Sequence, residues 1–286
     1  RMAHYAFDRG ITHFDLANNY GPAYGTAEEN FGRLMERSFR PYRDEMFIAT
    51  KAGYDMWPGP YGNWGSRKYL TASLDQSLRR MKLDYVDVFY SHRHDPETPL
   101  EETLQALVDI VRRGKALYVG LSRYPLEAER FAFRYLAERD VPCLLFQDRY
   151  NLFDRKPETS GVLSLSAASG SGFVAFSPLA QGLLTGRYLD GVPQDSRMAE
   201  GRSLRSDVLT DAMLARIRGL NDLARRRGQT LAEMALAWLL SDRRVTSVII
   251  GGSSTAQIAD NLRALENTAF SDEELARINA LSREEA

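Results

Sequence analysis

Several features are scarce or missing in this sequence of 286 residues, and each shortage excludes a class of protein. Cys143 is the only cysteine, so no disulfide can form within the chain, and a cytoplasmic location is expected. No apolar run approaches the roughly 18 residues of a membrane-spanning helix, and no signal peptide is visible. The formal net charge of -1 offers no basic field that would hold nucleic acid.

The glycine-rich turn of dinucleotide-binding sheets is also missing. No G-x-G-x-x-G follows a short apolar run, which disfavours an open, doubly wound sheet. What the sequence does contain is a regular alternation of short apolar runs with amphipathic segments of helical period. This alternation predicts parallel strands covered by helices. The predicted strands are 11–17, 46–51, 85–92, 116–122, 143–147, 173–177 and 246–251.

The start of the chain indicates how these strands are arranged. Residues 2–7 have the pattern of a helix end that leads into the strand at 11–17, and such a helix follows an earlier strand in a β/α fold. We therefore expect an α/β fold of the (β/α)8 TIM-barrel type, one domain over residues 1–286, whose first strand precedes Arg1. The doubly wound sheet remains the alternative. A barrel without its first strand would expose two unpaired edges, and in a third interpretation such a chain is inactive.

Helix starts and long loops add local detail to this expectation. The S/T-x-x-E pattern of a capping box predicts helix starts at Thr26, Thr98, Thr230 and Ser271. Two segments, 52–66 and 181–209, break the alternation and are expected to be long loops with a functional role.

Polar side chains stand at the ends of three consecutive predicted strands: Asp15, Lys51 and His92. The carboxyl ends of parallel strands meet at one mouth of a barrel, where barrel enzymes carry their active sites. Tyr20 follows Asp15 by five residues and can bend back over this mouth. Asp15 could instead cap a turn and Lys51 could be a solvated strand end, but the combination favours a catalytic site.

The chemistry of these four residues is complementary. A free tyrosine has a pKa near about 10, and an adjacent ammonium group lowers that pKa. A carboxylate beside the lysine keeps the ammonium charged and fixed. The sequence thus predicts that Tyr20 donates a proton to a carbonyl oxygen, that Lys51 and Asp15 tune Tyr20, and that His92 orients the carbonyl.

The segment 10–21, with Asp15 and Tyr20, resembles the signature of the aldo-keto reductase family. Ala49-Thr50-Lys51 and Tyr90-Ser91-His92-Arg93 resemble the other two catalytic segments of this family. Residues 57–66 and 177–186 are similar to the branch that holds bacterial L-glyceraldehyde 3-phosphate reductases and potassium-channel β subunits. The resemblance covers the whole chain.

This resemblance implies an NAD(P)H-dependent oxidoreductase that reduces a small aldehyde, such as L-glyceraldehyde 3-phosphate or methylglyoxal. The alternative is a cofactor-binding regulatory subunit of the channel β type. Channel β subunits typically carry asparagine where this chain has His92, so the histidine favours the enzyme. Relatives form tetramers or octamers, which makes a homo-oligomer an open option.

The resemblance also implies a site for NADPH, with NADH as the alternative. Ser122, Arg123 and Gln147 would hold the carboxamide of the nicotinamide, and Phe176 would stack on its ring. The other implied positions are Ser177, Leu179, Gln181, Gly182, Arg187 and Arg197 at the pyrophosphate, and Gly251, Ser253, Gln257, Asp260 and Asn261 at the adenosine. A helix that begins near Thr255 would offer free N–H groups to a phosphate. Relatives often place an arginine where Ser254 stands, so the preference for NADPH over NADH is a weaker expectation.

Other polar and aromatic residues keep two interpretations. His92 and His94 share a strand face, but two imidazoles without a third ligand do not predict a metal site. Arg67 and Arg93 either bind a substrate phosphate or are solvated. The aromatic residues of the first long loop either line a substrate pocket or pack on each other; they are Trp57, Tyr61 and Trp64.

Overall fold

The computed structural model describes residues 1–189 and 208–283. The chain divides into two compact units. The first, called the N-terminal unit, contains residues 3–147 and 160–173, and the second, the C-terminal unit, contains residues 1–2, 148–159 and 174–286. The single domain expected over the whole chain stays a prediction.

Strands follow one another in sequence order in the sheet, β1-β2-β3-β4-β5-β6-β7. Their bounds are His13–Asp15, Phe47–Ala52, Val86–Ser91, Ala116–Ser122, Cys143–Arg149, Gly172–Phe176 and Val245–Val248. The registers from β1 to β5 are parallel. A doubly wound sheet reverses its strand order at a switch point. The observed order contains no reversal among the described strands, so the alternation predicted from the sequence is confirmed and the doubly wound alternative is wrong.

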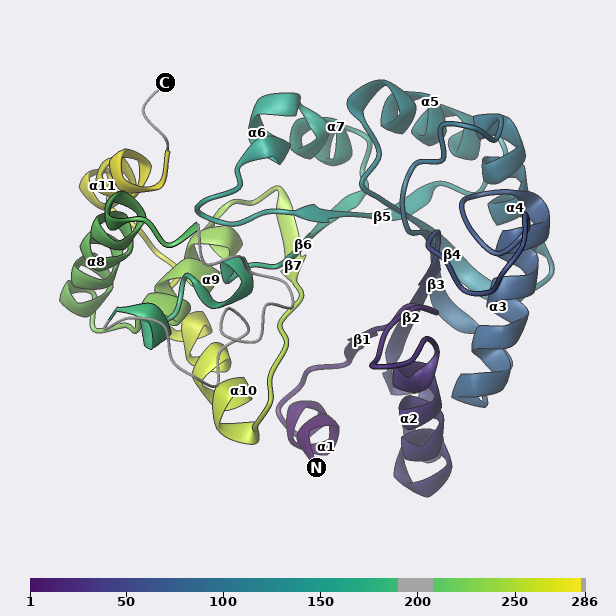
Figure 1. Cartoon of the computed structure of the whole chain (residues 1–286), viewed down its shortest axis with the longest axis horizontal. Helices are drawn as coiled ribbons and strands as arrows, with labels where there is room; N and C mark the ends of the chain where they lie inside the picture. The colour runs from purple at the N-terminus through teal and green to yellow at the C-terminus, as the bar shows by residue number, and fades with distance from the viewer. Residues whose placement is uncertain (190–207, 284–286) are drawn as a thin grey trace. The chain divides into compact units, whose positions relative to one another are not determined.

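Helices of the N-terminal unit follow its strands and lie side by side along them (Figure 1). Helix α4 shows why these segments are helical: Leu104, Leu107 and Val108 recur at helical spacing and are fully buried. Ser66 begins α3 with its hydroxyl, which accepts a hydrogen bond from the backbone of Tyr69 at 3.3 Å. The helices are α1 Met2–Phe7, α2 Thr26–Leu34, α3 Arg67–Met81, α4 Leu100–Arg112, α5 Leu126–Ala137 and α7 Val162–Ala168; a π-helical turn at Met35–Phe39 extends α2.

The C-terminal unit is mostly helical. Its helix α9 is apolar around most of its circumference, and Leu236 and Trp238 are both buried. The bounds of its helices are α8 Asp211–Arg226, α9 Leu231–Ser241, α10 Thr255–Leu262 and α11 Asp272–Ser282; α6 Lys156–Ser160 ends at the division between the units. None of the helices in the described residues is both long and apolar enough to cross a membrane.

Two of the four expected capping boxes are present. Thr230 accepts from the backbone of Glu233 at 3.2 Å, and the Glu233 carboxylate accepts from the backbone of Thr230 at 2.9 Å. Ser271 and Glu274 form the same pair of bonds at the start of α11. Both helix starts are therefore confirmed.

The boxes expected at Thr26 and Thr98 are wrong. Gly25 stands before α2, and the Thr26 hydroxyl donates to the Ala23 carbonyl at 2.8 Å instead of accepting. Pro99 stands before α4, and the backbone N–H of Thr98 donates to the Asp95 carboxylate at 3.3 Å. In a capping box the Glu101 carboxylate would accept from this N–H, so the Asp95 carboxylate has taken the place of Glu101.

Candidate active site

The ends of β1 and β2 bring a carboxylate and an ammonium group together inside the N-terminal unit. Asp15 pairs in register with Ala49, so Lys51 projects from the same face two residues further along β2. The Lys51 side chain is 0% exposed. Its Nζ donates to the Asp15 carboxylate and, at 2.9 Å, to the Leu16 carbonyl. A buried ammonium needs such partners, and here a carboxylate and a carbonyl provide them.

Tyr20 lies in the turn that follows β1 and is 37% exposed. The Lys51 ammonium lies over its ring, 5.0 Å from the ring centroid. Among the described residues no hydrogen bond joins the Tyr20 hydroxyl to Lys51. The structure therefore brings the two side chains together through the ring face and not through the hydroxyl. Since an ammonium has three N–H donors and two are held by Asp15 and Leu16, one remains available.

His92 follows β3 and is 8% exposed. Its ring lies 5.8 Å from the Tyr20 ring, centroid to centroid. Burial lowers the pKa of His92 to about 2, with further contributions from the positive charges of Lys51, Arg123 and Arg93. The imidazole is therefore neutral at physiological pH, and Nδ1 is buried without a hydrogen-bond partner among the described residues. A neutral ring with a free polar atom suits a hydrogen bond to a carbonyl oxygen.

Gly53 allows the chain after β2 to pass close to His92. A Cβ atom at this position would lie 2.9 Å from the His92 Cβ. The β2 segment also receives the backbone hydrogen bond of His92, whose N–H donates to the Ala52 carbonyl at 2.9 Å. The position of the imidazole thus depends on a glycine that the sequence pattern did not single out.

The expected carboxamide-binding residues lie at the ends of β4 and β5. Ser122 and Gln147 are neighbours in the register, and Gln147 donates to the Asp15 carboxylate at 3.2 Å. This link between the predicted cofactor residues and the predicted catalytic residues was not foreseen. Arg123 has a left-handed backbone, φ 55, and its Nη1 donates to the Tyr54 hydroxyl at 2.9 Å.

A nicotinamide carboxamide fits this part of the site. Ser122 Oγ is buried and has no hydrogen-bond partner among the described residues. Such an atom is costly unless a ligand or water satisfies it. A carboxamide offers both a donor and an acceptor, which Ser122 and Gln147 could meet together.

Five of the six positions expected at the pyrophosphate lie in the described residues of the C-terminal unit. Ser177, with φ 52, follows β6, and its carbonyl accepts from the Asn151 side chain at 3.0 Å. Gln181 has φ 57 and a buried Oε1 without a partner among the described residues. The backbone of Arg187 donates to the Thr185 hydroxyl at 3.3 Å. Leu179 and Gly182 belong to the same turn region as Gln181. Phe176, the residue expected to stack on the nicotinamide ring, is the last residue of β6. Arg197 lies outside the described residues.

The positions expected at the adenosine surround the start of α10. Ser254 is the N-cap of this helix, and its hydroxyl accepts from the Gln257 backbone at 3.2 Å. The Gln257 side chain accepts from the Ser253 backbone at 2.9 Å. Asp260 pairs with Arg263 at 2.9 Å. Gly251 precedes this turn, and Asn261 is buried on the helix. Helix α10 begins at Thr255, so the predicted helix start is confirmed.

Several residues with two interpretations have partners in the structure. Arg67 forms an ion pair with Asp109, between α3 and α4, which disfavours a role in binding substrate. The ring of His94 packs against Tyr124 at 5.4 Å. The described residues contain no cluster of three or more side chains that could hold a metal ion.

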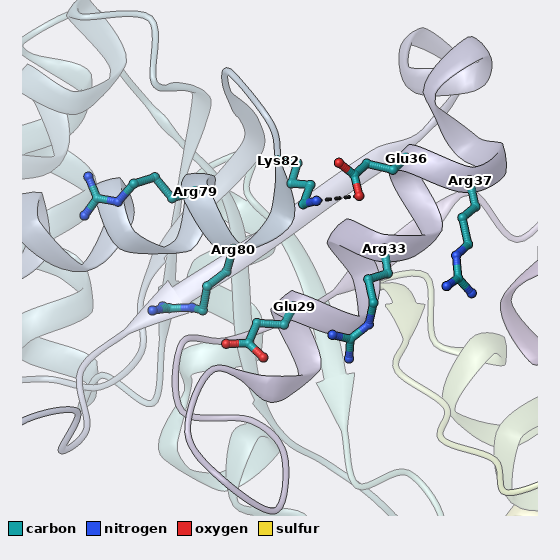
Figure 2. Close-up of a pocket in the computed structure, with 7 residues that line it drawn as sticks. All are labelled: Glu29, Arg33, Glu36, Arg37, Arg79, Arg80 and Lys82. Carbon is teal, nitrogen blue, oxygen red and sulfur yellow. Dashed lines mark ion pairs between the residues drawn. The ribbon is translucent and has the colours of Figure 1, made fainter.

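A second group of charged side chains lines an open hollow of about 590 Å³ on the N-terminal unit (Figure 2). It lies between the carboxyl ends of α2 and α3, where positive side chains are favoured by the helix dipole. Five of its residues are basic and two are acidic: Arg33, Arg37, Arg79, Arg80, Lys82, Glu29 and Glu36. None of the four predicted catalytic residues lines it.

Comparison with known proteins gives consistent results. The sequence model of the aldo/keto reductase family matches residues 1–283 of this chain. The L-glyceraldehyde 3-phosphate reductase of Escherichia coli K12 is 59% identical over 278 residues, covering 96% of this chain and 80% of that protein. The protein of the same name from strain O157:H7 is 58% identical over the same length. A probable voltage-gated potassium channel subunit beta from Oryza sativa is 38% identical over 265 residues, covering 91% of this chain and 79% of that protein.

Proposed function

Since the chain belongs to the aldo/keto reductase family and is an NAD(P)H-dependent oxidoreductase, we propose that it reduces a small aldehyde to the alcohol. Tyr20 is the proposed proton donor, NADPH the proposed cofactor, and L-glyceraldehyde 3-phosphate the first substrate to test. The (β/α)8 TIM-barrel class expected from the sequence agrees with this family.

The observation that supports this proposal is the buried Asp15–Lys51 pair beside Tyr20 and His92. Bound NADPH supplies the hydride that the carbonyl carbon receives. Neutral His92 donates a hydrogen bond to the carbonyl oxygen, and Tyr20 gives its hydroxyl proton to the same oxygen as negative charge develops there. The ammonium of Lys51, fixed by Asp15, stabilises the phenolate that Tyr20 becomes.

The residues proposed to hold the cofactor are those that the family resemblance implies. Ser122, Gln147 and Arg123 are proposed to bind the carboxamide, and Phe176 to stack on the nicotinamide ring. The turn around Gln181 and the start of α10 are proposed to bind the phosphates, because free backbone N–H groups favour anions. NADPH over NADH is proposed from the family, and Ser254, where relatives often have an arginine, makes this preference the weaker part of the proposal.

Positive charge beside His92 supports an anionic aldehyde as substrate. Arg93 and Arg123 both lie near enough to lower the pKa of His92. Their positive charge favours an anionic substrate near His92, while the guanidinium groups themselves donate to Gly53, Asn63 and Tyr54. Two bacterial relatives bear the name of a reductase for a phosphorylated aldehyde, which agrees with this choice.

Replacement of Tyr20 by phenylalanine tests the proposal directly. Steady-state oxidation of NADPH with glyceraldehyde 3-phosphate should fall by roughly 100- to 10,000-fold, the usual contribution of a general acid. The dissociation constant for NADPH, measured by fluorescence quenching, should stay within about two-fold because Tyr20 is assigned to the aldehyde. Unchanged turnover in this variant would refute the role of Tyr20.

The second candidate is a cofactor-binding regulatory subunit, which the relatives named as channel β subunits suggest. Ordinary enzymes turn over at roughly 1–1000 per second, so far slower reduction with tight NADPH binding would favour this second role. The cytoplasmic location and a homo-oligomer stay predictions.

A further inference from the structure

The segment between β2 and α3, residues 53–66, is called here the β2–α3 loop. This loop has no regular secondary structure, and its buried positions, Gly53, Gly62 and Gly65, lie at its start and near its end. A loop of this length loses considerable conformational entropy when it takes one conformation, so specific contacts must hold it. One side chain outside the loop, Arg93, makes contacts near both of its ends.

Arg93 follows His92 directly in the sequence. Its Nε donates to the Gly53 carbonyl at 2.7 Å, and its Nη2 donates to the Asn63 side chain at 2.9 Å. The guanidinium carbon lies 4.2 Å from the centroid of the Tyr54 ring and 3.6 Å from that of Trp64. Only a planar group with several fixed N–H donors can make both kinds of contact at once, which distinguishes arginine from lysine here.

The far end of the loop has an unfavourable backbone conformation that these contacts offset. Trp64 has φ 69, in the left-handed region that a bulky side chain rarely takes. Its backbone N–H donates to the Asn63 side chain at 2.7 Å, and this is the same oxygen that accepts from Arg93. Arg93 therefore contacts both the ring of Trp64 and the group that supports its backbone.

At the near end of the loop, Tyr54 connects the residues that Arg93 anchors to His92. The Tyr54 ring meets the His92 ring edge-on, with centroids 4.7 Å apart and an interplanar angle of 85°. The Tyr54 hydroxyl accepts from Arg123, and its carbonyl accepts from the Tyr69 hydroxyl. Because Tyr54 is held from several sides, it forms a fixed wall against the imidazole.

We propose that Arg93 is a positioning residue for the aldehyde: it fixes the β2–α3 loop so that Tyr54 stays against His92 and limits the size of the substrate. This inference rests on the proposed function, since it concerns the same reducing site. The aromatic residues of the loop do not form one mutual cluster. Trp57 packs on Tyr69, whereas Tyr54 and Trp64 contact Arg93.

Arg93→Lys tests the inference because it keeps the charge and removes the planar group. With glyceraldehyde 3-phosphate and NADPH, KM should rise at least 10-fold while kcat changes less than three-fold. The ratio of kcat/KM for this aldehyde to that for a bulky one, 4-nitrobenzaldehyde, should fall at least 10-fold. The dissociation constant for NADPH should stay within two-fold. Arg67→Lys, an exposed arginine paired with Asp109, is the matched control and should change none of these values.

A double variant separates anchoring from direct binding of the substrate. Tyr54→Ala should change the selectivity in the same direction as Arg93→Lys, and the double variant should lie within about two-fold of the stronger single variant, since both changes act through one contact. Additive effects, or an equal loss with both aldehydes at unchanged selectivity, would overturn the inference.

Limited proteolysis keeps this test separate from the proposed function. Arg93→Lys should make cleavage within residues 53–66 at least five-fold faster than in the unaltered protein, with an unchanged thermal midpoint. Equal cleavage rates would reject the anchoring role even in an active enzyme. If the unaltered protein reduces no aldehyde, the proposed function fails, and the cleavage rates still decide whether Arg93 anchors the loop.

Discussion

The N-terminal unit contains two groups of charged side chains that differ in almost every physical respect. The Asp15–Lys51 pair is buried at the ends of two strands, and each charge has fixed partners. The hollow between α2 and α3 holds more charge but lies open to solvent, and its pair of Lys82 and Glu36 is 42% and 48% exposed. The number of charges therefore says little about chemistry, whereas burial and fixed geometry say a great deal.

The origin of this difference lies in the elements that carry the charges. Strand ends present side chains from a rigid backbone, and in Lys51 and Asp15 the sheet register fixes their separation. The hollow is lined by long side chains from helix surfaces, such as Arg37 and Arg79 (Figure 2). Such side chains lose conformational entropy when an ion pair holds them, and water already stabilises their charges. Their ion pairs therefore add little to the free energy of unfolding.

Of the replacements considered, Lys51→Met should have the largest effect on stability and on turnover. It leaves the Asp15 carboxylate buried without its cation, which costs about 3–5 kcal/mol of unfolding free energy. Turnover should fall roughly 100-fold or more, as for the loss of an electrostatic stabiliser. Urea unfolding and steady-state kinetics measure the two effects. Stability within about 1 kcal/mol of the unaltered protein would show that the pair is less isolated from water than its burial indicates.

The pH dependence of stability should reveal the buried histidine. The folded-state pKa of His92, about 2, lies below an unfolded value near about 6.5, so the unfolded chain binds the extra proton as the pH falls. The stability that depends on the neutral His92 is complete at pH values above the unfolded-state pKa, and it is lost progressively as the pH falls below that value. Between pH 7 and pH 5 the unfolding free energy should therefore drop by about 2 kcal/mol more than in His92→Gln. Parallel curves for the two proteins would contradict the buried, neutral imidazole.

Replacement of Lys82 by methionine should have the smallest effect. The exposed pair with Glu36 contributes at most about 1 kcal/mol, and moderate salt should remove that contribution. Aldehyde reduction should be unchanged. A loss comparable with that of Lys51→Met in the same urea experiment would remove the distinction between the two groups.

The sequence predicted the strands and the strand-end residues well, because both depend on local patterns. Asp15 and Lys51 end apolar runs, and the parallel register then brings them together. The sequence did not predict the contact of Gln147 with Asp15, which joins residues 132 positions apart. It predicted that Lys51 lies beside Tyr20, but not that the ammonium faces the ring of Tyr20, which depends on how the turn after β1 folds back.

Predictions from local sequence patterns were wrong where a side chain from another position took the expected hydrogen bond. Thr98 had the correct spacing for a capping box, but Asp95 takes its backbone N–H. The role of Arg93 was undecided in the sequence, because its contacts depend on the conformation of a loop that begins 40 residues earlier at Gly53. The residues of the proposed cofactor site came mainly from the family resemblance, apart from the helix start near Thr255, which the sequence itself indicated. Some of them, such as Arg123, Ser177 and Gln181, have a left-handed backbone that local patterns do not predict.

Gly53 has a consequence for attempts to redesign the protein. Any side chain there would collide with the Cβ of His92, so the chain must leave β2 through a glycine whatever sequence follows. Libraries that graft new loops to change the accepted aldehyde should therefore vary positions from Tyr54 onward and keep Gly53. Grafts that replace the glycine would displace the imidazole before any new pocket could form.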